Sequence, residues 1–560
     1  MKSLAKIENL SISFPTAEKE NTVVKNISFD LEKNKIIGIV GESGSGKSVT
    51  SLAIMGLLPK NKAKITGEIT FNDTDILGLS EEAFRKIRGN KIAMIFQEPM
   101  SSLNPSLTCG YQVFEILKEH TNLTDKEAKE EVINLFNQVR LPRAAQIYKQ
   151  YPHQISGGQK QRVMIAMAIA CKPDILIADE PTTALDVTVQ KEIIQLLKHL
   201  QQETQMSILF ITHDLALLSE IADEVIVMYK GKIVEKGTAK EVFLHPKNNY
   251  TKALILSKPQ LNKRLQILPT IENLISKKND SEFKEKPISV QERKRKHQQI
   301  YANPPLLTIN ELATYFTSKK NTVKAVDNIS LQIYKGETLG LVGESGCGKT
   351  TLGRTIMGLE KATKGSILYQ GKDITKLTKN ERKNLARDIQ IIFQNPYSSL
   401  NPRMLVGEAI LEPMEVHKLY KNKQELQEKV FEILEKVGLQ KEHYYRYPHE
   451  FSGGQRQRIG IARTIALMPK IIICDESVSA LDVSVQAQVL NLLNQLKKDF
   501  GFTYIFISHD LAVVKHMADQ LAVMNKGKLE EIGDADTIYK NPKKEYTKTL
   551  INAIPKGLEA

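Results

Sequence analysis

The chain has 560 residues, which is more than one hydrophobic core organises, so we expect several domains. Hydrophobic residues make up 41% and charged residues 25%, as is typical of a globular protein, and no apolar run approaches the ~20 residues of a membrane-spanning helix. The N-terminus lacks the apolar region of a signal peptide. The four cysteines are scattered and form no CxxC pair, so the sequence supports neither a zinc site nor a disulfide framework, and a reducing cytoplasm fits. The net charge of +14 is compatible with nucleic acid, an anionic membrane surface or a basic proteome.

The first strong motif is a glycine-rich stretch, GESGSGKS at 41–48, which fits the P-loop pattern G-x-x-x-x-G-K-[ST]. The apolar run KIIGIV before it predicts a buried strand, and VTSLAIMGLL after it predicts a helix. Glycines let successive backbone N–H groups converge on phosphate oxygens, and the helix N-terminus adds the positive end of a dipole. The lysine of such a loop reaches the β- and γ-phosphates, and the next hydroxyl binds Mg²⁺. The predicted phosphate-binding residues are Gly41, Ser43, Gly44, Gly46, Lys47 and Ser48.

Three further motifs follow in the first half. ISGGQKQR at 155–162 looks like a phosphate site at a helix start, yet it carries no Gly-Lys-Ser of its own. The continuous apolar run DILIADE predicts a strand buried on both faces, with Asp179 and Glu180 at its carboxyl end. Asp179 is suited to hold Mg²⁺ through water, and Glu180 is suited to polarise the attacking water as general base. His213 follows another predicted strand, SILFIT, and we interpret it as a γ-phosphate sensor.

The same series returns in the second half as GESGCGKT (343–350), FSGGQRQR (451–458) and KIIICDE (470–476). The serine of SGGQ precedes the aspartate by 23 residues, and the aspartate precedes the histidine by 34, in both halves. Such rigid spacing over several elements predicts the same fold twice. The equivalent site residues are Gly343, Ser345, Gly346, Gly348, Lys349, Thr350, Asp475, Glu476 and His509.

Residues 258–303 interrupt the repeat with eleven Lys or Arg against five Asp or Glu. We interpret this segment as a charged, solvated linker between a first domain, 1–257, and a second domain, 304–560. As a flexible coil it would span roughly 40 Å between its ends.

The order of P-loop, glutamine, SGGQ, Asp-Glu and histidine resembles the nucleotide-binding domain of ATP-binding-cassette (ABC) proteins in both halves. The resemblance implies an α/β fold: two tandem P-loop NTPase (ABC-type) domains, each a mainly parallel-sheet core with an antiparallel β subdomain and a helical subdomain. It also implies two ATP molecules, with Mg²⁺, between halves packed head to tail, so that the SGGQ of one half caps the ATP on the lysine of the other. The residues to which it assigns a role are Ser156, Gly157, Gly158, Ser452, Gly453 and Gly454 as caps, Gln97 and Gln394 as sensors of Mg²⁺ and γ-phosphate, and Phe14 and Phe316 as rings against adenine. In the second half Tyr315 competes with Phe316 for this role.

The tracts QEPMSSLNP and QNPYSSLNP, with YTKALI and YTKTLI later in each half, resemble the ATPase subunits of oligopeptide, dipeptide and nickel importers. That resemblance implies a peripheral ATPase on the cytoplasmic face of the inner membrane. It would power import, with peptides as the cargo that the family suggests. Two separate permease subunits would form the pore, and a substrate-binding protein would deliver the cargo to them. The alternative is a soluble tandem ABC ATPase that acts on ribosomes or nucleic acid, which the basic charge would suit. Pro259, Pro269 and Pro287 in the linker and the missing CxxC pairs favour transport, with no nucleic acid expected. The sequence does not identify the cargo.

Overall fold

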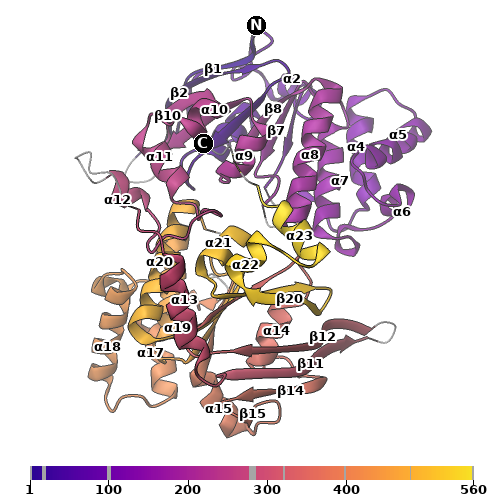
Figure 1. The fold of residues 1–560 in the computed structure, drawn as a ribbon. Coiled ribbons are helices and arrows are strands. Elements are labelled where there is room, and N and C mark those ends of the chain that lie inside the picture. The colour runs from indigo at the N-terminus through magenta and orange to yellow at the C-terminus, as the bar shows by residue number, and fades with distance from the viewer. Residues whose placement is uncertain are drawn as a thin grey trace. The chain divides into compact units, whose positions relative to one another are not determined.

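The computed structural model describes residues 3–15, 20–97, 102–183, 185–275, 285–318, 322–395, 399–479, 481–555 and 557. The chain forms two compact units: a first unit, residues 1–255 with 555–560, and a second unit, residues 256–554. Each unit carries its own central sheet, its own antiparallel sheet and its own group of helices (Figure 1). The predicted fold class is therefore confirmed in both halves.

The central sheet of the first unit has the strand order β10-β9-β3-β8-β7-β6, and all its neighbours are parallel except β10 and β9. The P-loop strand β3 and the Asp-Glu strand β7 are buried along their whole length, as expected for strands covered on both faces. The strands are β3 (Ile36–Val40), β6 (Ile92–Ile95), β7 (Ile175–Asp179), β8 (Ser207–Thr212), β9 (Glu224–Tyr229) and β10 (Lys232–Thr238).

The second unit repeats this sheet in the order β16-β17-β18-β13-β19-β20. Its strands are β13 (Thr338–Val342), β16 (Ile389–Ile392), β17 (Ile471–Asp475), β18 (Thr503–Ile507), β19 (Gln520–Asn525) and β20 (Lys528–Asp534).

An antiparallel sheet packs against each central sheet, and the two share one hydrophobic core. In the first unit Ile7 and Ile12 of β1 belong to the same buried cluster as Ile37 of β3 and Ile177 of β7. The antiparallel strands are β1 (Ser3–Pro15), β2 (Glu20–Glu32), β4 (Lys64–Phe71) and β5 (Thr74–Asp75), and β11 (Leu307–Thr317), β12 (Thr322–Ile333), β14 (Lys364–Tyr369) and β15 (Lys372–Asp373).

Helices complete both units and include the helical subdomain. In the second unit its Val406, Ile410, Val430 and Leu434 belong to the same buried cluster as Ile472 of β17 and Phe506 of β18. The first unit has α1 (Lys47–Ile54), α2 (Glu81–Arg85), α4 (Cys109–His120), α5 (Asp125–Gln138), α6 (Ala144–Tyr148), α7 (Gly157–Ile169), α8 (Val187–Thr204), α9 (Leu215–Ile221), α10 (Ala239–Leu244) and α11 (Asn249–Leu256). The second has α14 (Lys349–Ile356), α15 (Lys379–Asp388), α17 (Val406–Val416), α18 (Lys423–Lys436), α19 (Gly453–Ile465), α20 (Val483–Phe500), α21 (Leu511–Met517), α22 (Ala535–Lys540) and α23 (Glu545–Asn552).

The segment 258–303 differs from the flexible coil that its composition predicts. It contains α12 (Ile271–Ile275) and α13 (Val290–Tyr301), and contacts place its described residues in the second unit. Leu265, Leu268 and Ile300 are buried, and Leu268 joins the core of the second unit. Burial of these few apolar side chains anchors the segment, although its charge and its prolines suggested a solvated chain.

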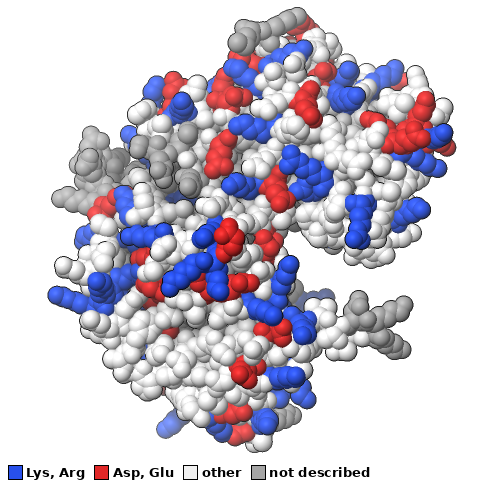
Figure 2. All heavy atoms as spheres, turned by 45° about the vertical axis from the view of Figure 1, so that its right-hand side comes forward, with Lys and Arg blue, Asp and Glu red and all other residues white. Residues whose placement is uncertain are grey.

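On the face shown in Figure 2, cationic and anionic side chains are interspersed rather than gathered by sign. Within the described part of the chain, no helix combines the length and the apolar character needed to cross a membrane.

Candidate functional site

The first P-loop connects β3 to α1, as the strand–loop–helix context predicts. Gly44 and Gly46 have φ values of 75° and 100°, which side chains rarely adopt, so the tight turn requires glycine at both positions. Lys47 is 6% exposed, and its Nζ donates to the carbonyl oxygens of Gly41 at 2.7 Å and Glu42 at 2.9 Å. The ammonium therefore lies folded inside the loop, whose crest, Ser43 and Gly44, faces solvent.

The second P-loop, between β13 and α14, has nearly the same geometry. Gly346 and Gly348 have φ values of 76° and 106°, and Lys349 Nζ donates to the carbonyl oxygens of Gly343 at 2.7 Å and Glu344 at 2.9 Å. Ser345 and Gly346 form its exposed crest. Both loops are thus equipped to cradle a polyphosphate.

Each P-loop helix offers its first hydroxyl to the aspartate at the end of β7 or β17, two strands away from the P-loop strand in the sheet. Ser48 Oγ donates to Asp179 Oδ1 at 3.2 Å, and Thr350 Oγ1 donates to Asp475 Oδ1 at 3.0 Å. The two carboxylates are only 5% and 7% exposed. Of the residues predicted to hold a metal, the hydroxyl and the aspartate are therefore in contact in both units.

Glu180 is the meeting point of the predicted catalytic groups in the first unit. Gln97 Nε2 donates to Glu180 Oε2 at 3.0 Å, and His213 Nδ1 lies 3.3 Å from the same oxygen. The backbone N–H of Glu180 donates to Ile211 of β8, while its φ of 47° turns the chain out of the sheet. A left-handed conformation costs a non-glycine residue of order 1 kcal/mol, so the fold holds this carboxylate in a strained position.

Glu476 repeats this arrangement in the second unit. Gln394 Nε2 donates to Glu476 Oε2 at 2.7 Å, His509 Nδ1 lies 3.5 Å away, and the φ of Glu476 is again 47°. The glutamine, glutamate and histidine come from three separate stretches of sequence, and the sheet brings them together in each half.

The acidic side chains of each pair have opposite pKa shifts. Burial and the neighbouring Glu180 raise the pKa of Asp179 to about 6, against the opposing effects of Ser48 and Lys47. Burial also raises the pKa of Glu180, but the hydrogen bond and charge of His213 outweigh it and lower this pKa to about 2. In the second unit burial raises the pKa of Asp475, and His509 lowers that of Glu476. Each glutamate is therefore an anionic acceptor at neutral pH.

The two SGGQ elements cap helices α7 and α19. Ser156 Oγ accepts from the N–H of Gln159 at 3.3 Å, and Ser452 Oγ accepts from Gln455 at 3.3 Å, each within a capping box. The backbone N–H of Ser156 donates to Gln159 Oε1 at 2.9 Å, whereas Gly157 is exposed, so its N–H at the helix start can face a ligand.

The second glycine of each element has a different role. A Cβ on Gly158 would lie 2.8 Å from Val189 of α8, and one on Gly454 would lie 2.4 Å from Val485 of α20. Gly157 and Gly453 have no atom within 4 Å of such a Cβ. Gly158 and Gly454 thus allow close helix packing, whereas the first glycine leaves the capping face open.

Comparison with known proteins gives these sites a family. The model of the family described as "ABC transporter" matches residues 24–183 and 326–479, and that described as "Oligopeptide/dipeptide transporter, C-terminal region" matches residues 234–282 and 531–557. The chain is 46% identical to the glutathione import ATP-binding protein GsiA of Escherichia coli (strain K12), over 98% of this chain and 89% of that protein. The chain belongs to the ABC transporter family. GsiA of Shigella dysenteriae serotype 1 is similar to the same extent.

Solved structures of ATP-binding cassettes are also similar. The dimeric cassette MJ0796 bound to ADP and Pi covers 41% of this chain and 98% of its own, with 26% identity and a TM-score of 0.38. CbiO1 from Clostridium perfringens, part of the complex cbiONQ, covers 43% and 92%, with 25% identity and a TM-score of 0.39. The family membership makes this chain a tandem ATP-binding protein with ATPase activity, and each half can now be called a cassette.

The metal that the family implies fits the donor set. A hydroxyl and a buried carboxylate in hydrogen-bonding contact, such as Ser48 with Asp179, are the hard oxygen ligands that Mg²⁺ prefers. Burial disfavours the charged form of Asp179, and a bound cation would offset that cost.

The two predicted adenine-stacking rings differ in exposure. Phe316 is 45% exposed at the end of β11, whereas Phe14 of β1 is partly buried against the core of the first unit. β2, the partner of β1, reaches the P-loop, because a Cβ on Gly46 would lie 3.0 Å from Val24. Stacking of Phe14 and Phe316 on adenine remains a prediction.

Sequence reasoning missed two tyrosines that hold the P-loops. Tyr250 Oη accepts the backbone N–H of Glu42 at 3.2 Å, and Tyr546 Oη accepts that of Glu344 at 3.2 Å. The repeated YTKALI and YTKTLI strings contain these tyrosines. Because each tyrosine lies more than 200 residues after its P-loop, the sequence did not indicate this contact. The Glu180 site also contains Thr183, whose Oγ1 donates to Glu180 Oε2 at 2.9 Å.

Proposed function

We propose that this chain powers the import of glutathione or similar small peptides. The supporting observation is the 46% identity to glutathione import ATP-binding proteins along nearly the whole chain, with both cassettes in the same order. The matches to the oligopeptide/dipeptide transporter region in both halves support peptide-type cargo. The ribosome or nucleic-acid alternative gains no support from any of these relatives, so we do not propose it.

The proposed working form pairs residues 1–257 with residues 304–560 head to tail around two ATP molecules. Ser156 and the N–H groups of Gly157 and Gly158 would cap the γ-phosphate held by Lys349, and the serine and glycines of 452–454 would cap that held by Lys47. Helix N-termini bind anions, and each SGGQ lacks a lysine because the partner cassette supplies it. Two complete sites support hydrolysis in both.

Within each site the proposed roles follow from position. Lys47 would leave the loop carbonyls for the β- and γ-phosphates, and Ser48 with Asp179 would hold Mg²⁺, which neutralises phosphate charge when bound. Glu180 would orient and polarise the attacking water as an anionic acceptor, with Gln97 and His213 fixing its carboxylate. Lys349, Thr350, Asp475, Glu476, Gln394 and His509 would act alike in the second site.

The proposed assembly places this chain at the cytoplasmic face of the inner membrane. Two permease subunits would form the pore, and a substrate-binding protein would deliver the cargo. ATP-driven closure of the two cassettes would rearrange the permeases, and hydrolysis would reopen them.

Catalytic assignment can be tested with the double variant Glu180→Gln plus Glu476→Gln. Turnover should fall by roughly 10²–10⁴, the usual contribution of a positioned base, while ATP binding persists. Glu130→Gln, on the exposed surface of α5, is the matched control and should keep full activity. Normal hydrolysis by the double variant would refute the roles of both glutamates.

Assembly and cargo can be tested with the same double variant, tagged in its own host and extracted gently in ATP and Mg²⁺. Mass spectrometry should find two membrane permeases. Uptake of radiolabelled glutathione should disappear in cells that carry only the double variant and return with the native chain. If cells with the double variant lose dipeptide uptake and keep glutathione uptake, the cargo is a dipeptide and not glutathione. If the extracted chain carries ribosomal proteins and no permease, the transport function is refuted.

A further inference from the structure

The last helix of each cassette reaches back to the P-loop. Tyr250 is the second residue of α11, and its hydroxyl oxygen accepts the backbone N–H of Glu42 at 3.2 Å. Tyr546 is the second residue of α23, and its hydroxyl oxygen accepts the backbone N–H of Glu344 at the same distance. Both copies of the fold therefore make the same contact between a C-terminal helix and the second residue of the loop.

The contact completes a chain of hydrogen bonds across one peptide group. The peptide that joins Gly41 to Glu42 offers its N–H to Tyr250, and its C=O accepts from Lys47 Nζ at 2.7 Å. The corresponding peptide of the second P-loop lies between the hydroxyl of α23 and the ammonium of its own lysine, again at 2.7 Å on the lysine side. Hydrogen bonds in such a chain strengthen one another, so the phenol and the ammonium together fix the plane of this peptide.

The start of the first P-loop packs tightly against the end of β9. A Cβ on Gly41 would lie 2.1 Å from the carbonyl oxygen of Met228. The next residue, Tyr229, stacks on Tyr250 with the ring centroids 4.2 Å apart, and Tyr250 is only 2% exposed. The loop, the end of β9 and the tyrosine ring are therefore packed in contact, which leaves the phenol little freedom to move away from the loop.

A glutamate on the edge strand fixes each tyrosine-bearing helix to the central sheet. Glu235 of β10 accepts the backbone N–H of Lys247 at 2.7 Å and that of Asn248 at 3.2 Å. Asn248 Oδ1 in turn accepts the N–H of Tyr250 at 2.8 Å. Glu531 of β20 accepts the two equivalent N–H groups in the second unit, at 3.0 and 3.2 Å. The hydroxyl is thus positioned by an element that is tied to the same sheet as the P-loop.

We propose that Tyr250 and Tyr546 are positioning residues for ATP, and that α11 and α23 are thereby coupled to the occupancy of the P-loops. The inference rests on the proposed movement of Lys47 and Lys349 from the loop carbonyls to the phosphates. That movement removes the ammonium from the peptide C=O, whereas the phenol still holds the peptide N–H. The tyrosine keeps the loop in the shape that cradles phosphate, so that ATP does not have to order the loop when it binds.

Coupling of this kind is reciprocal. Because the tyrosine contact raises the affinity for ATP, bound ATP must stabilise the helix that carries the tyrosine by the same factor. Both helices lie in the segments that match the oligopeptide/dipeptide transporter C-terminal region, 234–282 and 531–557. This region therefore takes part in nucleotide binding, and a partner that displaces α11 or α23 would lower the affinity of that cassette for ATP.

Hydrogen exchange of the full nucleotide-free chain, resolved to single amides by mass spectrometry, tests the contact. Tyr250→Phe keeps the ring and removes the hydroxyl. Exchange of the Glu42 amide should rise roughly 3–10-fold, the factor that one hydrogen bond supplies, while exchange of the Glu344 amide stays unchanged. Tyr546→Phe should have the opposite pattern, so each variant is the control for the other. Unchanged exchange at both amides would overturn the contact.

Titration with the non-hydrolysable analogue AMP-PNP tests the effect on affinity. In Tyr250→Phe plus Tyr546→Phe the Kd should rise roughly 3–10-fold. The KM for ATP should rise by a similar factor, with kcat changed less than about twofold. Tyr111→Phe, an exposed ring on α4, is the matched control and should change none of these values. A merely structural role would lower kcat through loss of folded protein and leave Kd and KM unchanged, and that result would overturn the positioning role.

The exchange measurement with saturating AMP-PNP tests the coupling. Bound analogue should slow exchange of the α11 and α23 amides in the native chain, and Tyr250→Phe plus Tyr546→Phe should lose this protection. No slowing in the native chain would overturn the coupling. If Tyr250→Phe lowers the folded fraction, Tyr546→Phe takes its place, because its ring is less buried. Neither the exchange nor the titration needs hydrolysis or cargo, so failure of the catalytic or import proposals is seen separately.

Discussion

Asp179→Asn should stabilise the nucleotide-free protein while it removes Mg²⁺-dependent hydrolysis. The carboxyl is 5% exposed, and burial raises its pKa from 3.8 to about 6. A shift of about two pKa units corresponds to roughly 3 kcal/mol, which the folded state loses by keeping this carboxylate ionised at pH 8. Asparagine carries no charge and can still accept the hydrogen bond of Ser48. We expect the free energy of unfolding of the variant to exceed that of the native chain by up to this amount.

The pH dependence follows from the direction of the shift. Because the folded pKa lies above the unfolded one, the native aspartate binds its proton more tightly when folded. The advantage of the variant should be absent below about pH 4, grow between pH 4 and 6, and stay constant above about pH 7. Burial also raises the pKa of Asp475, so Asp475→Asn should show the same trend.

Thermal unfolding of the full chain between pH 4 and 8, followed by circular dichroism without nucleotide, provides the measurement. A change of about 3 kcal/mol corresponds to roughly 6–12 °C for a cassette of this size. Asp174→Asn is the control: its side chain is 40% exposed, just before the same strand, and the change should alter the free energy of unfolding by less than about 0.5 kcal/mol. Equal unfolding temperatures of Asp179→Asn and the native chain, or a difference that does not vary with pH, would refute the reasoning.

Two further substitutions probe the backbone of the second cassette, and urea unfolding with ATP titration measures both. Gly348→Ala should be severely destabilising and abolish ATP binding, because its Cβ would lie 2.0 Å from Ala325 O, whereas Gly346→Ala has open space and should cost only about 1 kcal/mol for its φ of 76°. Similar losses for the two would contradict this packing argument. Ser477→Pro should be neutral or stabilise the fold by up to about 1 kcal/mol. The equivalent Pro181 follows a glutamate with the same φ, so the backbone at this position accepts proline. Within the described chain the buried Ser477 Oγ has no hydrogen-bond partner, so its removal loses no such bond. A loss above that amount would show that the two turns are not equivalent.

Local sequence patterns were sufficient to predict the fold of each cassette and most of its site. The P-loop is contiguous, its glycines and lysine act within eight residues, and the apolar runs before Asp179 and His213 identify their strands directly. Since parallel strands present their carboxyl ends at one edge of a sheet, the order of the strands along the chain is enough to bring these motifs together. The sequence also established the duplication, because both halves keep the same intervals between motifs.

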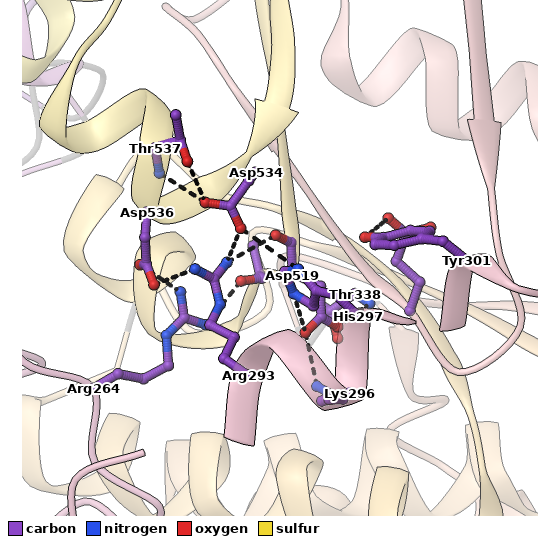
Figure 3. A network of polar contacts seen from close by, with 12 residues as sticks. Arg264, Arg293, Lys296, His297, Tyr301, Thr338, Asp519, Asp534, Asp536 and Thr537 are labelled. Carbon is purple, nitrogen blue, oxygen red and sulfur yellow. Dashed lines mark hydrogen bonds and ion pairs between the residues drawn. The ribbon is translucent and has the colours of Figure 1, made fainter. Parts of the chain in front are cut away.

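Only the tertiary structure decided the contacts between distant and unremarkable residues. Tyr250 lies 208 residues from the P-loop N–H that it accepts, and no local pattern connects the two. Residues 258–303 have the composition of a solvated linker, and the order of α13 within them depends on Arg293 meeting Asp534 and Asp536 more than 240 residues later (Figure 3). Charge alone is ambiguous in a sequence, because the same cation is solvated on an open surface and ordered where a buried acidic partner receives it.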